Sequence, residues 1–136
     1  MNDHKSLVLV TGAGGFIGGN LIGALRAHGY TRIRAVDVKP FDGWYQRFDG
    51  VESLSIDLNL KENCEKAAEG ARDIYNLAAN MGGMGFIEHN KALCMLSVLI
   101  NTHMLQAAVK FGVQRFFYSS SACVYNGEKQ KTLEAT

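Results

Sequence analysis

The sequence predicts an α/β fold in which a parallel sheet carries helices on both faces. Short apolar runs alternate with longer helical stretches along the 136 residues, which is typical of βαβ units joined by right-handed crossovers. Several of these runs are apolar on both faces, as strands buried in a parallel sheet are. A glycine-rich turn directly follows the first run, where the chain passes from strand to helix.

The pattern predicts five strands and three helices. The strands are expected at residues 6–11, 32–38, 52–56, 73–77 and 115–119, and the helices at residues 16–28, 59–70 and 87–111. Gly29 favours the first helix end, because glycine accepts the left-handed conformation found there. Asn59 is expected to cap the second helix, with Glu62 completing a capping box. Residues 40–50 are expected to form an irregular loop.

Composition excludes several classes of protein. The formal net charge of +1 supplies no basic surface for nucleic acid or an anionic membrane. The apolar run near the N-terminus, residues 7–10, is too short for a signal peptide or a membrane span. Cys64, Cys94 and Cys123 are too far apart to indicate a disulfide framework or a zinc site, and no histidine has a partner at metal-ligand spacing. These features favour one cytoplasmic domain with reduced thiols and no bound metal.

The glycines of the first turn predict a dinucleotide site. Gly12 permits a tight turn, Gly15 lets the backbone approach a pyrophosphate, and Gly18 lets the helix pack closely. The helix N-terminus attracts the phosphates through its unpaired amides and its dipole. Asp37 lies 19 residues beyond Gly18, where a carboxylate can bind an adenosine ribose and would repel a 2′-phosphate. NAD is therefore favoured over NADP, and the nearby Lys39 weakens this inference only slightly.

The Gly-x-x-Gly-x-x-Gly spacing resembles the fingerprint of the extended short-chain dehydrogenase/reductases. The resemblance implies a Rossmann-type domain over residues 1–136, with strand order 3-2-1-4-5, incomplete at its C-terminus. It also implies that the cofactor site includes Phe16, Ile17, Asp57, Leu58, Ala78, Ala79 and Asn101. Without the resemblance, Asp57 would be a strand-end carboxylate, the alanines plain core, and Asn101 a polar residue in a helix interface.

A second glycine-rich segment, at residues 80–86, follows the fourth predicted strand. Together with residues 115–125, it resembles the GDP-mannose 3,5-epimerase branch of the family. The resemblance implies a nucleotide-sugar substrate, with a GDP-hexose favoured, bound by Gly82, Gly83, Met84, Ser121, Ala122 and Cys123. It further implies that Ser121 hydrogen-bonds the reacting sugar oxygen and that Cys123 exchanges protons beside a transiently oxidised C4. Otherwise, Cys123 would be a small buried residue and Ser121 a strand-end hydroxyl.

The family's catalytic tyrosine and lysine, four positions apart on a helix, have no equivalent here. Tyr125 and Lys129 have this spacing, but the residues between them lack a helical apolar face. We therefore expect part of a protein at least twice as long, inactive alone and homodimeric when complete, with Met95 and Leu99 among the packing residues of its long helix. Other nucleotide-sugar 4-epimerases, dehydratases or decarboxylases, and a non-catalytic NAD sensor, are the alternative interpretations.

Overall fold

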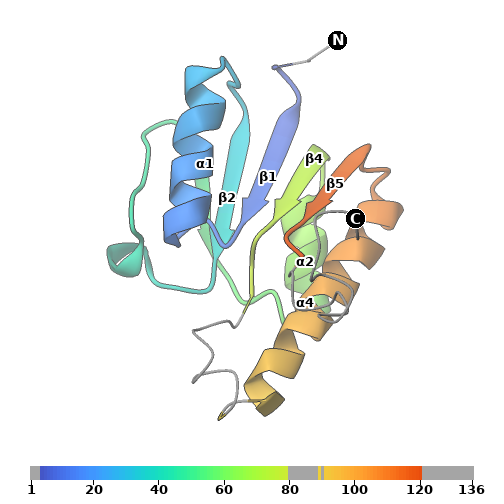
Figure 1. The fold of residues 1–136 in the computed structure, drawn as a ribbon. Coiled ribbons are helices and arrows are strands. Elements are labelled where there is room, and N and C mark those ends of the chain that lie inside the picture. Colours follow the sequence, from blue (N-terminus) through green and yellow to red (C-terminus); the bar gives the residue numbers. More distant parts are fainter. Residues whose placement is uncertain (1–3, 80–88, 90, 121–136) are drawn as a thin grey trace, which may run out of the picture.

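A computed structural model describes residues 4–79, 89 and 91–120, and within them it contains a five-stranded parallel sheet (Figure 1). The strands are β1 (Leu7–Thr11), β2 (Ile33–Asp37), β3 (Glu52–Ser55), β4 (Ala71–Asn76) and β5 (Arg115–Tyr118). They lie in the order β3-β2-β1-β4-β5, so the predicted Rossmann-type order is confirmed. Each strand begins and ends within two residues of its predicted limits.

The helices cover both faces of the sheet, as predicted. Figure 1 shows α1 (Phe16–Ala27) on one face, and α2 (Lys61–Ala68) and α4 (Lys91–Lys110) on the other. Among the described residues, no helix has the length and apolarity needed to cross a membrane.

The central strand β1 belongs to both cores. Leu7 and Leu9 pack with α2 and α4, whereas Val8 and Val10 pack with α1. This alternation follows from the strand geometry, in which successive side chains point to opposite faces. Burying each of these side chains stabilises the fold by about 1.5–3 kcal/mol. Because β1 is the central strand and is packed on both faces, its carboxyl end is fixed in the middle of the row of strand ends.

The long helix α4 is only partly buried in the described structure. Met104 is fully buried in the core shared with α2. Met95 and Leu99, which the sequence also predicts as packing residues, are exposed on α4. The described part of the molecule therefore leaves an apolar stretch of this helix uncovered.

The start of α2 differs from the prediction. Its N-cap is Leu60, and no side chain caps the helix, so the predicted capping box of Asn59 and Glu62 is wrong. The side-chain amide of Asn59 instead donates to Asp57 Oδ1 at 2.8 Å. Because its side-chain amide is bound to the Asp57 carboxylate, Asn59 does not cap α2.

The segment predicted as an irregular loop is partly regular. Residues 40–48, which we call the strap, begin with a 3-10 helix at Phe41–Gly43 and then run beside α1 (Figure 1). Trp44 of the strap is buried in the core on the α1 face of the sheet. The strap therefore joins the end of β2 to the outer side of α1.

Candidate functional site

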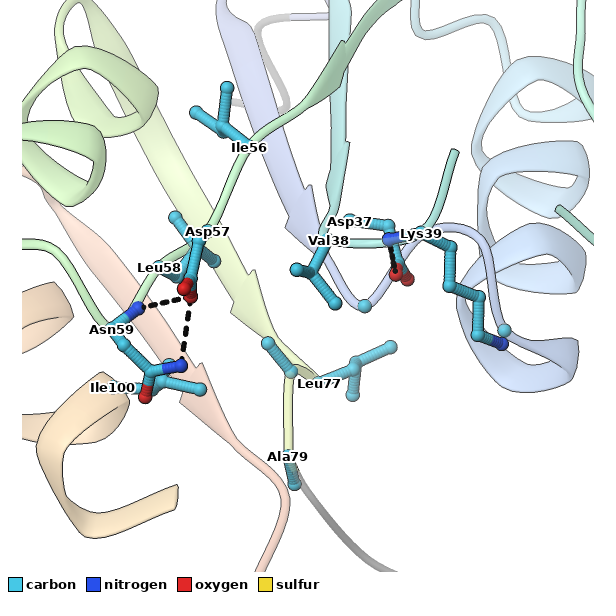
Figure 2. Close-up of a pocket in the computed structure, with 13 residues that line it drawn as sticks. Asp37, Val38, Lys39, Ile56, Asp57, Leu58, Asn59, Leu77, Ala79 and Ile100 are labelled. Atoms are coloured by element: carbon cyan, nitrogen blue, oxygen red, sulfur yellow. Dashed lines mark hydrogen bonds between the residues drawn. The ribbon is translucent and has the colours of Figure 1, made fainter. Parts of the chain in front are cut away.

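A cavity of about 240 Å³ opens at the carboxyl ends of the strands (Figure 2). Its walls come from the turns after β1, β2, β3 and β4 and from α4, and consist of Gly12, Gly15, Asp37, Val38, Lys39, Ile56, Asp57, Leu58, Asn59, Leu77, Ala78, Ala79 and Ile100. β1 lies between β2 and β4 in the sheet. The connection that follows β1 therefore leads to one side of β1, and the connection that follows β3 leads to the other side. Open α/β sheets bind ligands in the crevice at such a switch point.

The turn from β1 to α1 is packed so closely that Gly12 and Gly18 have no room for a side chain. Gly12 has a φ of 67°, and a Cβ atom there would lie 2.7 Å from the carbonyl oxygen of Leu77. A Cβ on Gly18 would lie 2.8 Å from the Cα of Ala13, behind the turn. Gly15 is the N-cap of α1, and no side chain caps the helix. This helix N-terminus therefore presents backbone amides at the cavity wall, as in an anion site.

Asp37 lies at the cavity wall with its carboxylate held by two backbone amides. Lys39 N donates to Oδ1 at 3.0 Å (Figure 2), and Gly14 N donates to Oδ2 at 2.9 Å. The residue is only 8% exposed. Each carboxylate oxygen can accept more than one hydrogen bond, so Asp37 can still accept hydroxyl donors from a ligand.

The turn after β3 contributes a second fixed carboxylate. The backbone and side-chain nitrogens of Asn59 both donate to Asp57 Oδ1, at 2.9 and 2.8 Å (Figure 2). Asn59 Oδ1 is buried and has no hydrogen-bond partner. Sequence reasoning identified Asp57 and Leu58 but missed the part that Asn59 plays in holding Asp57.

A buried polar network supports the wall on the β4 side. Thr11 Oγ1 donates to Asn76 Oδ1 at 2.7 Å and accepts the backbone N–H groups of Leu77 and Ala78, both at 3.1 Å. Asn76 Nδ2 donates to Asn101 Oδ1 of α4 at 2.6 Å. Thr11 and Asn76 are 0% and 2% exposed. The sequence indicates the role of Thr11 and Asn76 only weakly, because all it shows is that each is a polar residue at the end of a strand.

Most of the predicted cofactor residues meet at the cavity. Its walls include Gly12, Gly15, Asp37, Asp57, Leu58, Ala78 and Ala79. Phe16 and Ile17 lie on the first turn of α1 with exposed side chains, and Gly18 lies behind the turn. The predicted substrate and catalytic residues Gly82, Gly83, Met84, Ser121, Ala122 and Cys123 lie outside the described residues.

The thiol of Cys64 lies close to this site but is unsuited to chemistry. Burial, together with the negative charges of the nearby Asp57 and Glu62, raises the pKa of Cys64 to about 12. Its Sγ donates to the carbonyl oxygen of Leu58 at 3.1 Å. Because the thiolate is the nucleophilic form, Cys64 is inert at neutral pH and has a packing role.

The chain matches one protein-family model and several curated proteins. The model of the NAD dependent epimerase/dehydratase family matches residues 8–136. GDP-mannose 3,5-epimerase 1 of Oryza sativa subsp. japonica is 42% identical over 128 residues, which make up 93% of this chain and 34% of the relative. GDP-mannose 3,5-epimerase of Arabidopsis thaliana is 42% identical over 130 residues, 95% of this chain and 34% of the relative. The chain thus spans about a third of the length of these curated relatives.

Solved structures share the fold. The epimerase Mth375 of Methanothermobacter thermautotrophicus superimposes with a TM-score of 0.76 at 26% identity, covering 90% of this chain and 37% of that one. MoeE5, solved in complex with UDP-glucose and NAD, superimposes with a TM-score of 0.74 at 31% identity, covering 88% of this chain and 38% of that one.

Proposed function

Because this chain belongs to the NAD-dependent epimerase/dehydratase family, we propose that its cavity binds NAD and that it forms the cofactor-binding part of a nucleotide-sugar epimerase. The observation that carries the NAD assignment is the buried carboxylate of Asp37 beside the glycine turn. A dinucleotide needs a helix N-terminus whose preceding glycine turn lets the pyrophosphate approach the backbone, and an acceptor for its ribose hydroxyls. Both features meet in this cavity.

Each part of the cofactor has suitable residues. The N-terminus of α1, with Gly12, Gly15, Phe16 and Ile17, would hold the pyrophosphate, and Gly18 would keep the helix close to it. Asp37 would accept the hydroxyls of the adenosine ribose. Asp57 and Leu58 would contact adenine, and Ala78, Ala79 and Asn101 would border the rest of the site.

An Asp37→Ala variant is expected to bind NAD at least tenfold more weakly than the wild type. Hydrogen bonds to a charged group contribute about 1.5–3 kcal/mol each, and this substitution removes those made to the ribose. Calorimetric titration of the chain with NAD and NADP measures the effect, and the wild type should favour NAD. Asp49→Asn, which changes an exposed carboxylate outside the cavity wall, is the control and should bind as the wild type does. Equal NAD affinity in Asp37→Ala and the wild type would remove Asp37 from the site.

We further propose GDP-mannose as the substrate of the complete enzyme, which is supported by the two relatives at 42% identity. Held by the N-terminus of α1 and by Asp37, NAD would supply reversible hydride transfer at C4 of the sugar. Ser121 would hydrogen-bond the reacting oxygen, and Cys123 would exchange protons at the carbons beside C4. Gly82, Gly83, Met84 and Ala122 would line the sugar site. The complete enzyme would be a cytoplasmic homodimer, with the exposed Met95 and Leu99 of α4 at the subunit contact.

The substrate proposal predicts ring-carbon exchange. The complete enzyme, incubated with GDP-mannose in deuterated water, should incorporate deuterium at the carbons beside C4, because 3,5-epimerisation removes and returns those protons. Mass spectrometry and proton NMR measure the incorporation. A nucleotide-sugar 4-epimerase would turn over without this exchange, and a non-catalytic NAD sensor would not turn over. Cys123→Ala should slow the exchange at least a hundredfold, and this 136-residue chain alone should show none.

A further inference from the structure

We propose that the strap is the positioning element of the cofactor site and that Trp44 is the residue through which it selects NAD over NADP. This inference rests on the proposed NAD site at Asp37. It adds a specificity-determining residue, Trp44, that does not border the cavity.

Trp44 closes a ring of contacts around the Asp37 carboxylate. Its indole Nε1 donates to the carbonyl oxygen of Lys39 at 2.9 Å, and the N–H of the same lysine donates to Asp37 Oδ1. On the other side, the indole packs on Gly14, whose N–H donates to Asp37 Oδ2. The indole therefore supports both backbone amides that hold the carboxylate.

Gly14 shows how closely these groups are packed. A Cβ atom there would lie 2.9 Å from two ring atoms of Trp44 and 3.1 Å from Cγ of Asp37. Gly14 has no positive φ, so its backbone conformation does not require glycine. The position requires glycine because Trp44 and Asp37 fill the space that a side chain would need.

The rest of the strap lies in register with α1. Tyr45 N donates to the carbonyl oxygen of Gly14 at 2.9 Å. Further along, Gln46 and Phe48 pack on Gly19 and Gly23 of α1. Two residues of an extended chain span about 6.6 Å and four residues of a helix about 6 Å, so alternate strap residues match successive helical turns. The strap is therefore anchored along α1, and Trp44 is held in place from both directions.

This anchoring has a consequence for cofactor choice. A 2′-phosphate can enter beside Asp37 only if the carboxylate moves away, since two like charges would otherwise meet without water between them. A carboxylate tied at both oxygens cannot rotate without breaking a hydrogen bond to a backbone amide. Weakening the support from Trp44 should therefore reduce the preference for NAD over NADP.

The test compares a strap variant with a destabilised control variant, both made in the chain itself. Trp44→Phe keeps an aromatic ring over Gly14 but removes the hydrogen bond to Lys39, and it should lower the ratio of the NADP to the NAD dissociation constant about fivefold to tenfold. Gly70→Ala, outside both the strap and the cavity wall, should lower the unfolding temperature because of the φ of 74° at this position while leaving that ratio unchanged. Calorimetric titration with NAD and NADP gives both constants, and circular dichroism gives the unfolding temperature.

The outcomes separate this inference from the proposed function. A wild-type chain that binds NAD, together with a Trp44→Phe variant of unchanged ratio, would overturn the role of the strap and leave the NAD site standing. A wild-type chain that binds neither dinucleotide would overturn both. If Trp44→Phe does not fold, Gly14→Ala provides the same test, because its methyl group would press on both Trp44 and Asp37. An unchanged ratio in Gly14→Ala would also contradict the inference.

Discussion

A Gly12→Ala variant is expected to lose about 3 kcal/mol of unfolding free energy and to bind no measurable NAD. The φ of 67° at this position costs alanine about 1–2 kcal/mol. The added Cβ would also lie 2.7 Å from the oxygen and 2.8 Å from the carbon of the Leu77 carbonyl. Both atoms belong to the backbone after β4, so relieving the overlap moves the cavity wall. Urea unfolding and calorimetric titration with NAD measure the two effects.

Gly70→Ala is the matched control for this prediction. Gly70 has a similar φ of 74°, but a Cβ atom there would have no neighbour within 4 Å. It also lies outside the cavity wall. This variant should therefore lose only the conformational cost, about 1–2 kcal/mol, and bind NAD normally. Equal losses of stability in the two variants would show that the close approach of the two turns is not what requires glycine at position 12.

A Thr11→Val variant should be destabilised by about 3–5 kcal/mol. Valine has nearly the shape of threonine, so the packing is preserved while the hydroxyl is lost. That hydroxyl accepts the N–H groups of Leu77 and Ala78 and donates to Asn76, all at buried or half-buried positions. An unsatisfied buried polar group costs about 1–3 kcal/mol, and three groups lose their partner here. NAD binding should weaken as well, because Leu77 and Ala78 form part of the cavity wall.

Thr11→Ser is the control variant, which distinguishes the effect of the hydroxyl on stability from that of the methyl group. Serine keeps the hydrogen-bonding oxygen and loses one buried methyl group, which should cost about 1 kcal/mol. Urea unfolding of the two variants gives the comparison. A valine variant as stable as the serine variant would mean that water or a backbone shift satisfies the groups around position 11.

The order of the strands and several residues of the cavity wall could be predicted from the sequence alone. Apolar runs and glycine positions are local properties of the chain. They therefore locate strands and turns without knowledge of which distant segments pack against them. The first predicted strand, residues 6–11, corresponds to β1 at Leu7–Thr11, and Gly29 ends the first helix with a φ of 86°. The resemblance to the family added Asp57, Leu58 and the alanine pair. These residues come together at the cavity because parallel strands bring their carboxyl ends to one edge.

Most of the contacts that hold these residues in place join segments far apart in the sequence, so they could not be predicted from it. Thr11 and Asn76 are 65 positions apart, Asn76 and Asn101 are 25 apart, and Gly14 and Asp37 are 23 apart. The strap looked irregular in the sequence because it has no hydrophobic periodicity of its own. Its order comes from the packing of Gln46 and Phe48 on Gly19 and Gly23 of α1. Asn59 looked like a helix cap because the sequence does not show whether its side chain binds the helix N-terminus or the carboxylate of Asp57, two residues earlier. Periodicity records whether a side chain is buried, whereas hydrogen-bond partners depend on which distant segments the fold brings together.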